Sequence, residues 1–262
     1  MKKRAIGRLV SSCLFTLLVI YSETLTFGQT SKPQFRVLAM TEAGGIHAPF
    51  VAAAKVWLKQ LADENNFTID YIENAEPVND AFLANYQLFI QLNYPPYMWS
   101  DTAKEAFRNY ITQGKGGWVG FHHATLLGEF DGYPMWPWFS EFMGGIRYKN
   151  YIASFAKATV QVEAKNHPCM KGVPATFEVQ KEEWYTYNKS PRPNVNVLAT
   201  VDESSYSPDS EIKMGGDHPV VWSNEHVKAR NVYVFMGHHP DLFRNNVFTT
   251  IFRNAIFWGA GK

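Results

Sequence analysis

Two histidine pairs follow strand-like apolar runs in this chain. His122-His123 follows residues 117–121, and His238-His239 follows residues 232–237. An unperturbed imidazole can transfer protons and ligate metals near neutral pH. Ligands of an α/β sheet sit beyond the carboxyl ends of its strands. The two pairs therefore predict a single crevice lined by imidazoles from distant parts of the chain. The alternative is that each pair only hydrogen-bonds nearby backbone.

The first pair lies in a Gly-x-His-x-Ala pattern, which is the outline of a nucleophile elbow. His122 takes the position that a tight strand-to-helix turn would hold exposed at the top of the sheet. Imidazole is a poor choice for a stable acyl-enzyme, but it is a good proton carrier or metal ligand. We therefore predict that His122 is catalytic and that His123 binds ligand.

The second pair continues into Pro240 and Asp241. A carboxylate two residues after a histidine can fix its tautomer and raise its basicity. We predict His239 as the catalytic partner of His122, with Asp241 as its orienting group and His238 as a ligand-binding residue. The alternative role for Asp241 is to cap the terminal helix.

A carboxylate beside two aromatic side chains, in Glu183-Trp184-Tyr185, can bind the hydroxyls and the face of a sugar. We predict Glu183 as a second proton carrier, and Trp184 and Tyr185 as ligand-binding residues. Strand alternation sends Glu183 and Tyr185 to one face and Trp184 to the other. Glu42 and His47, in the loop after the first predicted strand, share the sheet edge of His122 and are further ligand-binding candidates.

The sequence identifies no cofactor. Histidine spacings of one to three intervening residues and zinc thiolate pairs are absent from the sequence, as are phosphate loops and dinucleotide fingerprints. Spacing does not test a site assembled from His47, His122 and His239 on separate loops. A divalent metal ion is therefore one candidate, and the metal ligands are unknown at this point.

Strands alternate with helices in the first half of the chain, which is typical of a mainly parallel sheet. Strands are predicted at residues 35–40, 67–72, 88–92 and 117–121, and helices after residue 49, from residue 79, and at 100–114. The later part predicts a helix at residues 136–143, strands at 158–163, 176–179, 184–187, 195–200, 218–222 and 230–236, a surface loop at 202–216, and a terminal helix at 243–258. We predict one α/β domain over residues 30–262. Its sheet is mainly parallel and flavodoxin-like, with helices on both faces and extra β segments in the C-terminal half.

Residues 1–29 have the pattern of a secretory signal peptide, with a basic start, a short apolar stretch and small residues before Gln29. We predict cleavage near Gly28 and an exported chain, periplasmic or extracellular, without a membrane span. A lipoprotein anchored at Cys13 is less favoured because most apolar residues follow that cysteine. Cleavage would leave Cys169, for which a buried structural role is predicted.

The amino-acid composition limits the kinds of molecule that this protein is expected to bind. A net charge of +1 with 19% charged residues offers no electrostatic footprint for nucleic acid. Aromatic residues make up 15% of the chain and gather at residues 93–99 and 133–139, where they suit either sugar stacking or core packing. The predicted partner is a small carbohydrate, and a homo-oligomer is left open.

Taken in order, these motifs resemble the ThuA-like (trehalose-utilisation) family over residues 35–259. The motifs are residues 116–124, Asn166-His167-Pro168, Glu183-Trp184-Tyr185, residues 218–222 and Gly237-His238-His239. The resemblance implies the class I glutamine amidotransferase-like fold and a role in carbohydrate utilisation. In the wider fold the elbow carries cysteine, and a late His-Pro-Glu completes a triad. Here His122 replaces the thiol, which argues against glutamine hydrolysis.

Two functions follow from these features. The first is an exported enzyme, hydrolase- or lyase-like, acting on trehalose-like disaccharides or their keto derivatives by histidine and carboxylate acid-base chemistry, with or without a metal. The second is a noncatalytic carbohydrate-binding or accessory protein that uses the aromatic loops at residues 97–99 and 136–138.

Overall fold

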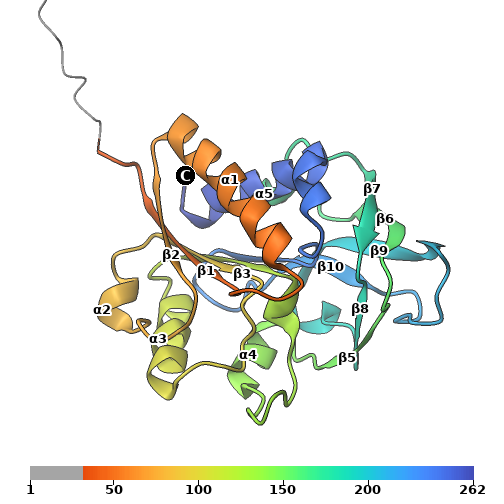
Figure 1. The fold of residues 1–262 in the computed structure, drawn as a ribbon, viewed down its shortest axis with the longest axis horizontal. Helices are drawn as coiled ribbons and strands as arrows, with labels where there is room; N and C mark the ends of the chain where they lie inside the picture. The colour runs from red at the N-terminus through yellow and green to blue at the C-terminus, as the bar shows by residue number, and fades with distance from the viewer. Residues whose placement is uncertain (1–31) are drawn as a thin grey trace, which may run out of the picture. The chain divides into compact units, whose positions relative to one another are not determined.

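A nine-stranded sheet runs through the protein in the computed structural model, which describes residues 32–262 (Figure 1). Its strands are β1 (Arg36–Thr41), β2 (Thr68–Ile72), β3 (Leu88–Leu92), β4 (Gly117–Phe121), β6 (Ala156–Val162), β7 (Thr176–Glu182), β9 (Asn196–Ser207), β10 (Pro219–Ser223) and β11 (Asn231–Val234). The strand order is β2-β1-β3-β4-β11-β10-β9-β6-β7. A separate two-stranded sheet pairs β5 (Tyr148–Tyr151) with β8 (Tyr185–Tyr187). The predicted signal peptide lies outside the described residues.

The strands from β2 to β11 in this order are parallel. Every residue of β3, β4 and β11 is buried. Parallel strands covered by helices on both faces read as continuous apolar runs, which is why the sequence predicted residues 88–92 and 117–121 as strands with the observed limits. The mainly parallel α/β architecture is confirmed.

Helices cover both faces of the sheet (Figure 1). They are α1 (Ala48–Asn65), α2 (Asp80–Leu83), α3 (Asp101–Thr112), α4 (Pro137–Phe142) and α5 (Asn246–Gly259). On one face α1 packs on α5, with the rings of Trp57 and Phe252 stacked 4.9 Å apart. On the other face α3 packs on α4 through Phe107 and Phe139, 5.9 Å apart. No helix in residues 32–262 is long and apolar enough to cross a membrane.

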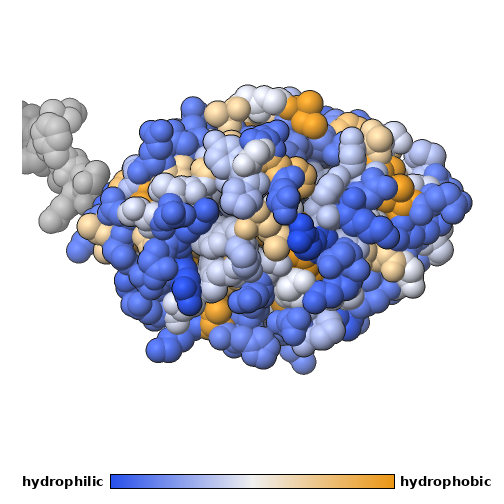
Figure 2. Space-filling model, turned by 90° about the horizontal axis from the view of Figure 1, so that it is seen from below, coloured by the Kyte–Doolittle hydropathy of each residue, from blue (hydrophilic) through white to orange (hydrophobic). Residues whose placement is uncertain are grey.

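The helix boundaries follow from local chemistry. The hydroxyl of Ser100 accepts a hydrogen bond from the N–H of Ala103 and caps α3, as the sequence predicted. Asn79 and Asn245 cap α2 and α5 in the same way. Seen from the side on which α3 and α4 lie, the surface is mostly hydrophilic with scattered apolar spots (Figure 2). That face therefore presents no large apolar docking area.

The predicted surface loop at residues 202–216 is partly wrong, because β9 continues to Ser207. The polar residues stay in the strand because β6 pairs with them, Thr159 opposite Asp202 and Lys157 opposite Ser207. Pairing of backbone groups with a neighbouring strand outweighs the low strand propensity of this polar stretch. The loop itself is shorter than predicted and spans residues 208–218 before β10.

A buried carboxylate on β9 anchors this loop. Glu203 is 7% exposed and accepts hydrogen bonds from the N–H groups of Met214, Gly215 and Gly216. Its Oε1 also lies 2.9 Å from Nδ1 of His218. Although burial alone would raise the pKa of Glu203, His218 and these N–H groups outweigh it and lower the pKa to about 2. The carboxylate therefore stabilises the folded state only while it is ionised.

We predict that Glu203→Gln lowers the free energy of unfolding by about 1–3 kcal/mol at pH 7. A pKa lowered from 4.5 to about 2 means that this contribution is complete above pH 4.5 and is lost as the pH falls toward 2. Urea unfolding at pH 7, 4 and 2.5 should therefore show wild type and variant converging at low pH. Glu211→Gln, an exposed change in the same loop, is the control. A difference that does not depend on pH would contradict this account.

Candidate functional site

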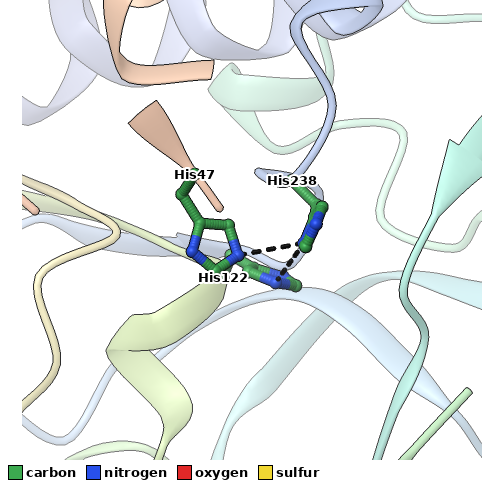
Figure 3. Close-up of side chains that lie close together, drawn as sticks. All are labelled: His47, His122 and His238. Carbon is green, nitrogen blue, oxygen red and sulfur yellow. Dashed lines mark hydrogen bonds between the residues drawn. The ribbon is translucent and has the colours of Figure 1, made fainter. Parts of the chain in front are cut away.

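The site lies where the parallel strands β1, β4 and β11 end. The loop after β1 carries Glu42 and His47, β4 runs into His122 and His123, and β11 leads to His238. Because β4 and β11 are parallel neighbours, with Phe121 opposite Val234, their following loops emerge side by side. Figure 3 shows the three imidazoles pointing toward one another from these three segments.

We call His47, His122 and His238 the histidine cluster. Nε2 of His47 lies 2.9 Å from Nδ1 of His238, which in turn lies 3.4 Å from Nε2 of His122 (Figure 3). His47 and His122 are fully buried, and His238 is 6% exposed. The hydroxyl of Tyr185 reaches the same nitrogen of His122 at 2.9 Å. Three ring nitrogens and a phenol therefore converge on one small volume.

The backbone at His122 is held in an unusual conformation. Its φ is +39°, in the left-handed region that L-residues other than glycine rarely adopt. Its carbonyl accepts hydrogen bonds from the hydroxyls of Thr125 and Tyr233, at 3.0 and 2.9 Å. The turn is tight, as the elbow outline predicted, but His122 is fully buried rather than exposed at the top of the sheet, because the loops after β1 and β11 and Tyr185 pack against it. The element that follows is a short 3-10 helix, His122–Thr125, rather than an α-helix.

Gly237 lets the two loops approach closely. A Cβ at this position would lie 2.8 Å from Cβ of His122 and 2.9 Å from Oδ1 of Asn93. Both contacts are too short for carbon, so only glycine fits here without moving His122. The side chain of Asn93 also donates to the carbonyl of Gly237 at 2.6 Å. The close approach of His122 and Asn93 therefore explains why a glycine precedes the second histidine pair.

Carboxylates surround the histidine cluster. Oε2 of Glu42 lies 3.0 Å from Nδ1 of His47 and 3.2 Å from Nδ1 of His123. Oε2 of Glu183 lies 3.6 Å from Nδ1 of His238. Loops after different strands therefore bring Glu42, His47, His123, His238 and Glu183 together around His122.

Glu182 is the buried carboxylate that sequence reasoning missed. It is fully buried and lies 3.9 Å from Nδ1 of His122. It accepts hydrogen bonds from the N–H groups of Glu183 and Gly237. The available signal was the adjacent pair Glu182-Glu183 at the end of β7, from which only the second residue was chosen. Glu182 links β7 to the turn that carries His238.

Burial dominates the protonation of the site. It lowers the pKa of His122 well below the ordinary value, and neighbouring imidazoles lower it further. It likewise lowers the pKa of His238 to about 3. Burial alone would raise the pKa of Glu42, but His123 and His47 outweigh it and hold the pKa at about 2. At neutral pH His122 and His238 are therefore uncharged, whereas Glu42, which contacts His47 and His123, is ionised.

A pocket of about 210 Å³ opens beside the histidine cluster. His123, Glu183 and Tyr185 supply its polar lining, and Ile46, Tyr148 and Tyr151 supply apolar surface. Ile46 is 69% exposed and Tyr151 is 39% exposed, so apolar side chains stand at the surface around polar groups. Apolar walls with a few converging polar groups are typical of small-molecule sites.

The second histidine pair divides between two places. The sequence paired His122 with His239, but the structure places His238 beside His122. Nδ1 of His239 lies 3.4 Å from Asp241, and both line a separate pocket with Lys181 and Arg244. The local pairing of His239 with Asp241 is thus present but lies outside the histidine cluster. Two adjacent histidines after a glycine give no sequence signal for which one turns inward.

The aromatic candidates also divide. Tyr185 faces the pocket, whereas Trp184 is fully buried and donates its indole N–H to the carbonyl of Ala156. Strand alternation explains the difference. Trp99 and Trp136 are 4% and 7% exposed and pack on each other at 5.5 Å. Trp99 and Trp136, two of the residues predicted to stack on sugars, therefore belong to the core, whereas Tyr97 and Trp138 are partly exposed and Met98 and Pro137 are exposed.

The geometry defines an α/β protein of the class I glutamine amidotransferase-like fold with a buried histidine cluster in place of a thiol. The family model described as ThuA, trehalose utilisation, matches residues 36–259. The chain belongs to the ThuA family. No curated protein matches it.

Solved structures support this placement. A ThuA-like protein from Bacteroides uniformis is 30% identical with a TM-score of 0.77, over 87% of this chain and 92% of that one. A ThuA-like protein from Parabacteroides merdae is 20% identical with a TM-score of 0.65, over 88% and 91%. A GMP synthase protein from Thermoplasma acidophilum is 11% identical with a TM-score of 0.53, over 87% and 94%, and shows likeness of fold alone.

The environment of Glu182 gives a pH-dependent prediction. Burial raises its pKa from 4.5 to about 8, although three backbone N–H groups act against this rise. The folded protein therefore keeps a proton that the unfolded chain loses, so stability falls as the pH rises from 4.5 to 8. We predict that the free energy of unfolding of Glu182→Gln, measured relative to wild type, rises by up to about 4 kcal/mol as the pH increases across this range.

Urea unfolding at pH 5, 6.5 and 8 measures this gain. Glu178→Gln on the same strand is the control, because Glu178 is exposed and its pKa is lowered by Lys157. The free energy of unfolding of the control should differ from that of wild type by the same amount at every pH above 4.5. A constant difference for Glu182→Gln as well would show that Glu182 is ionised in the folded protein.

Proposed function

We propose that this ThuA-family protein is an exported enzyme of carbohydrate utilisation, acting on trehalose-like disaccharides or their keto derivatives by proton transfer. One observation carries the proposal. Glu183, His123 and Tyr185 line a single small pocket, with the buried histidine cluster directly behind it. Acid-base groups converging on a partly apolar pocket favour an enzyme over a binding module.

The size and lining of the pocket suit one sugar ring. About 210 Å³ lies below the usual range of roughly 300–1,000 Å³ for pockets that enclose drug-sized ligands. A single ring of a disaccharide would fill it, while the second ring would lie near Ile46 and Tyr151 at the exposed rim. An aromatic face can stack on the C–H face of a sugar, and the polar groups can bind its hydroxyls.

The polar groups have complementary roles in proton transfer. Burial raises the pKa of Glu183, which brings this carboxyl closer to the range useful for a general base or acid at neutral pH. A keto sugar has an acidified C–H next to its carbonyl, which Glu183 could deprotonate. The hydroxyl of Tyr185 would then donate a hydrogen bond to the carbonyl oxygen, while the ring of His122, 4.5 Å from the ring of Tyr185, positions the phenol.

The chain offers no thiol for glutamine hydrolysis within residues 32–262. The elbow position holds His122, and the free Cys169 is buried. Burial raises the pKa of the Cys169 thiol to about 12, so this sulfur is neither accessible nor ionised at neutral pH. The family fold is therefore used here without the nucleophile that amidotransferase chemistry requires.

We predict turnover of at least one member of a panel of disaccharides and their 3-keto forms, read by mass spectrometry. Glu183→Gln and His122→Ala should each lower turnover by about 100-fold or more, because each removes or misaligns a proton carrier. His226→Ala, an exposed change outside the site, should retain wild-type turnover. Melting temperatures within a few degrees of wild type would exclude unfolding as the cause.

The alternative, a noncatalytic carbohydrate-binding protein, gives a different result. It predicts saturable sugar binding with no product and no effect of His122→Ala. Tyr151→Ala at the pocket rim would then weaken binding, because it removes a stacking face. This pattern would contradict the enzyme proposal.

Export forms part of the proposal because residues 1–29 have a signal-peptide pattern. We predict that protein recovered from the periplasm or medium of the producing cells begins at or near Gln29. Intact-mass measurement checks this. A secreted chain that retains its first 28 residues, or a protein confined to the cytoplasm, would contradict it.

A further inference from the structure

We propose that His47, His122 and His238 bind one divalent transition-metal ion, with zinc as the reference ion. The ligand atoms are Nε2 of His47, Nε2 of His122 and Nδ1 of His238, contributed by the loops after three parallel strands (Figure 3). The inference concerns metal binding, so it holds or fails independently of which sugar the pocket accepts.

The separations of these atoms fit a small tetrahedral ion. Zinc bound by imidazole at about 2.0–2.1 Å requires its nitrogen ligands to be roughly 3.3–3.4 Å apart. The nitrogen of His238 lies 2.9 Å from that of His47 and 3.4 Å from that of His122. All three ligand atoms lie within 4.8 Å of one another. A bound zinc ion would require the separation between His47 and His122 to be about 3.4 Å as well.

The second ring nitrogens of His47 and His122 each lie near a carboxyl group, as in many metal sites. Nδ1 of His47 lies 3.0 Å from Glu42, and Nδ1 of His122 lies 3.9 Å from Glu182. A carboxylate beside one ring nitrogen keeps the proton there and leaves the lone pair of the other nitrogen free for a metal. In His47 that nitrogen is Nε2, which points into the histidine cluster. In His122 the nitrogen that points into the cluster is also Nε2, and its lone pair faces the hydroxyl of Tyr185 at 2.9 Å, a contact that a bound ion would replace.

Unsatisfied polar atoms gather at this place. Within the part of the chain that the structure describes, the buried side-chain atoms without a hydrogen-bond partner include Nδ1 of His47, His122 and His123 and Oε2 of Glu42. Buried polar groups in folded proteins are nearly always paired, and local exceptions mark a binding site for an ion or water. These atoms are not the three proposed ligand nitrogens but lie beside them, on the rings of His47 and His122 and on the neighbouring His123 and Glu42.

The ligand set favours particular metals. Three imidazoles suit zinc, copper, iron or nickel, whereas magnesium and calcium prefer oxygen ligands. Glu42, His47 and His123 form a second, overlapping group whose ligand atoms also lie within 4.8 Å of one another. We assign the ion to the three histidines because His47 and His122 are fully buried, and we assign Glu42 to orienting His47.

The test uses the untagged protein after its metals are removed with a chelator. Equilibrium dialysis against zinc, read by elemental analysis, should give one ion per chain, and cobalt(II) should give the visible absorption of a tetrahedral complex. His47→Ala, His122→Ala and His238→Ala should each weaken zinc binding by more than about 100-fold. Glu42→Gln should weaken it by about 10–100-fold, as expected for a group that orients a ligand. The surface control His226→Ala should bind as wild type does.

Two further measurements distinguish a loss of metal binding from a failure to fold. Near-UV circular dichroism identifies variants that fail to fold, and His238→Gln serves as a milder change at the least buried ligand. Failure of wild type to bind zinc or cobalt stoichiometrically would overturn the proposal. Undiminished binding in folded His122→Ala and His238→Gln would also overturn it, and would transfer the ion to Glu42, His47 and His123. Sugar turnover is not used as a readout, so an inactive panel leaves this result unaffected.

Discussion

The parallel pairing of β4 with β11 is the constraint on which the site depends. These strands lie over a hundred residues apart in sequence, yet Phe121 is opposite Val234. Parallel neighbours end at the same edge of a sheet, so His122 and His238 emerge side by side. Gly237 permits the close approach, because any side chain there would meet His122. The loop after β1 then adds His47 and Glu42 from the same edge.

A group of buried imidazoles is costly to build in a protein interior. Desolvation opposes charge on each ring, and an unpaired buried polar atom loses the hydrogen bonds that water would supply. The protein offsets part of this cost with Glu42, Glu182 and Tyr185, which face ring nitrogens of His47 and His122. Such an arrangement is retained where polar groups are needed for binding or proton transfer. The pocket at Glu183 gives these buried groups access to a small molecule.

Local chemistry made much of the fold predictable. The apolar runs of β3 and β4 and the cap at Ser100 each depend on residues close together in the chain, and each was predicted near its observed limits. The polar end of β9 was not, because its strand conformation depends on pairing with β6. For the same reason Glu182 was missed, since its burial against Gly237 links residues 55 positions apart.

The sequence by itself determined the family, the alternation of strands and helices, and the set of residue types at the strand ends. Histidines after glycine at two strand termini are enough to indicate a shared edge, because parallel strands place their following loops together. Only the tertiary structure decided which members meet. It turned His238 inward and His239 toward Asp241, and it placed Trp184 in the core and Tyr185 at the pocket. The physical reason is that side-chain direction at a turn is set by packing against distant segments, which spacing along the chain does not encode.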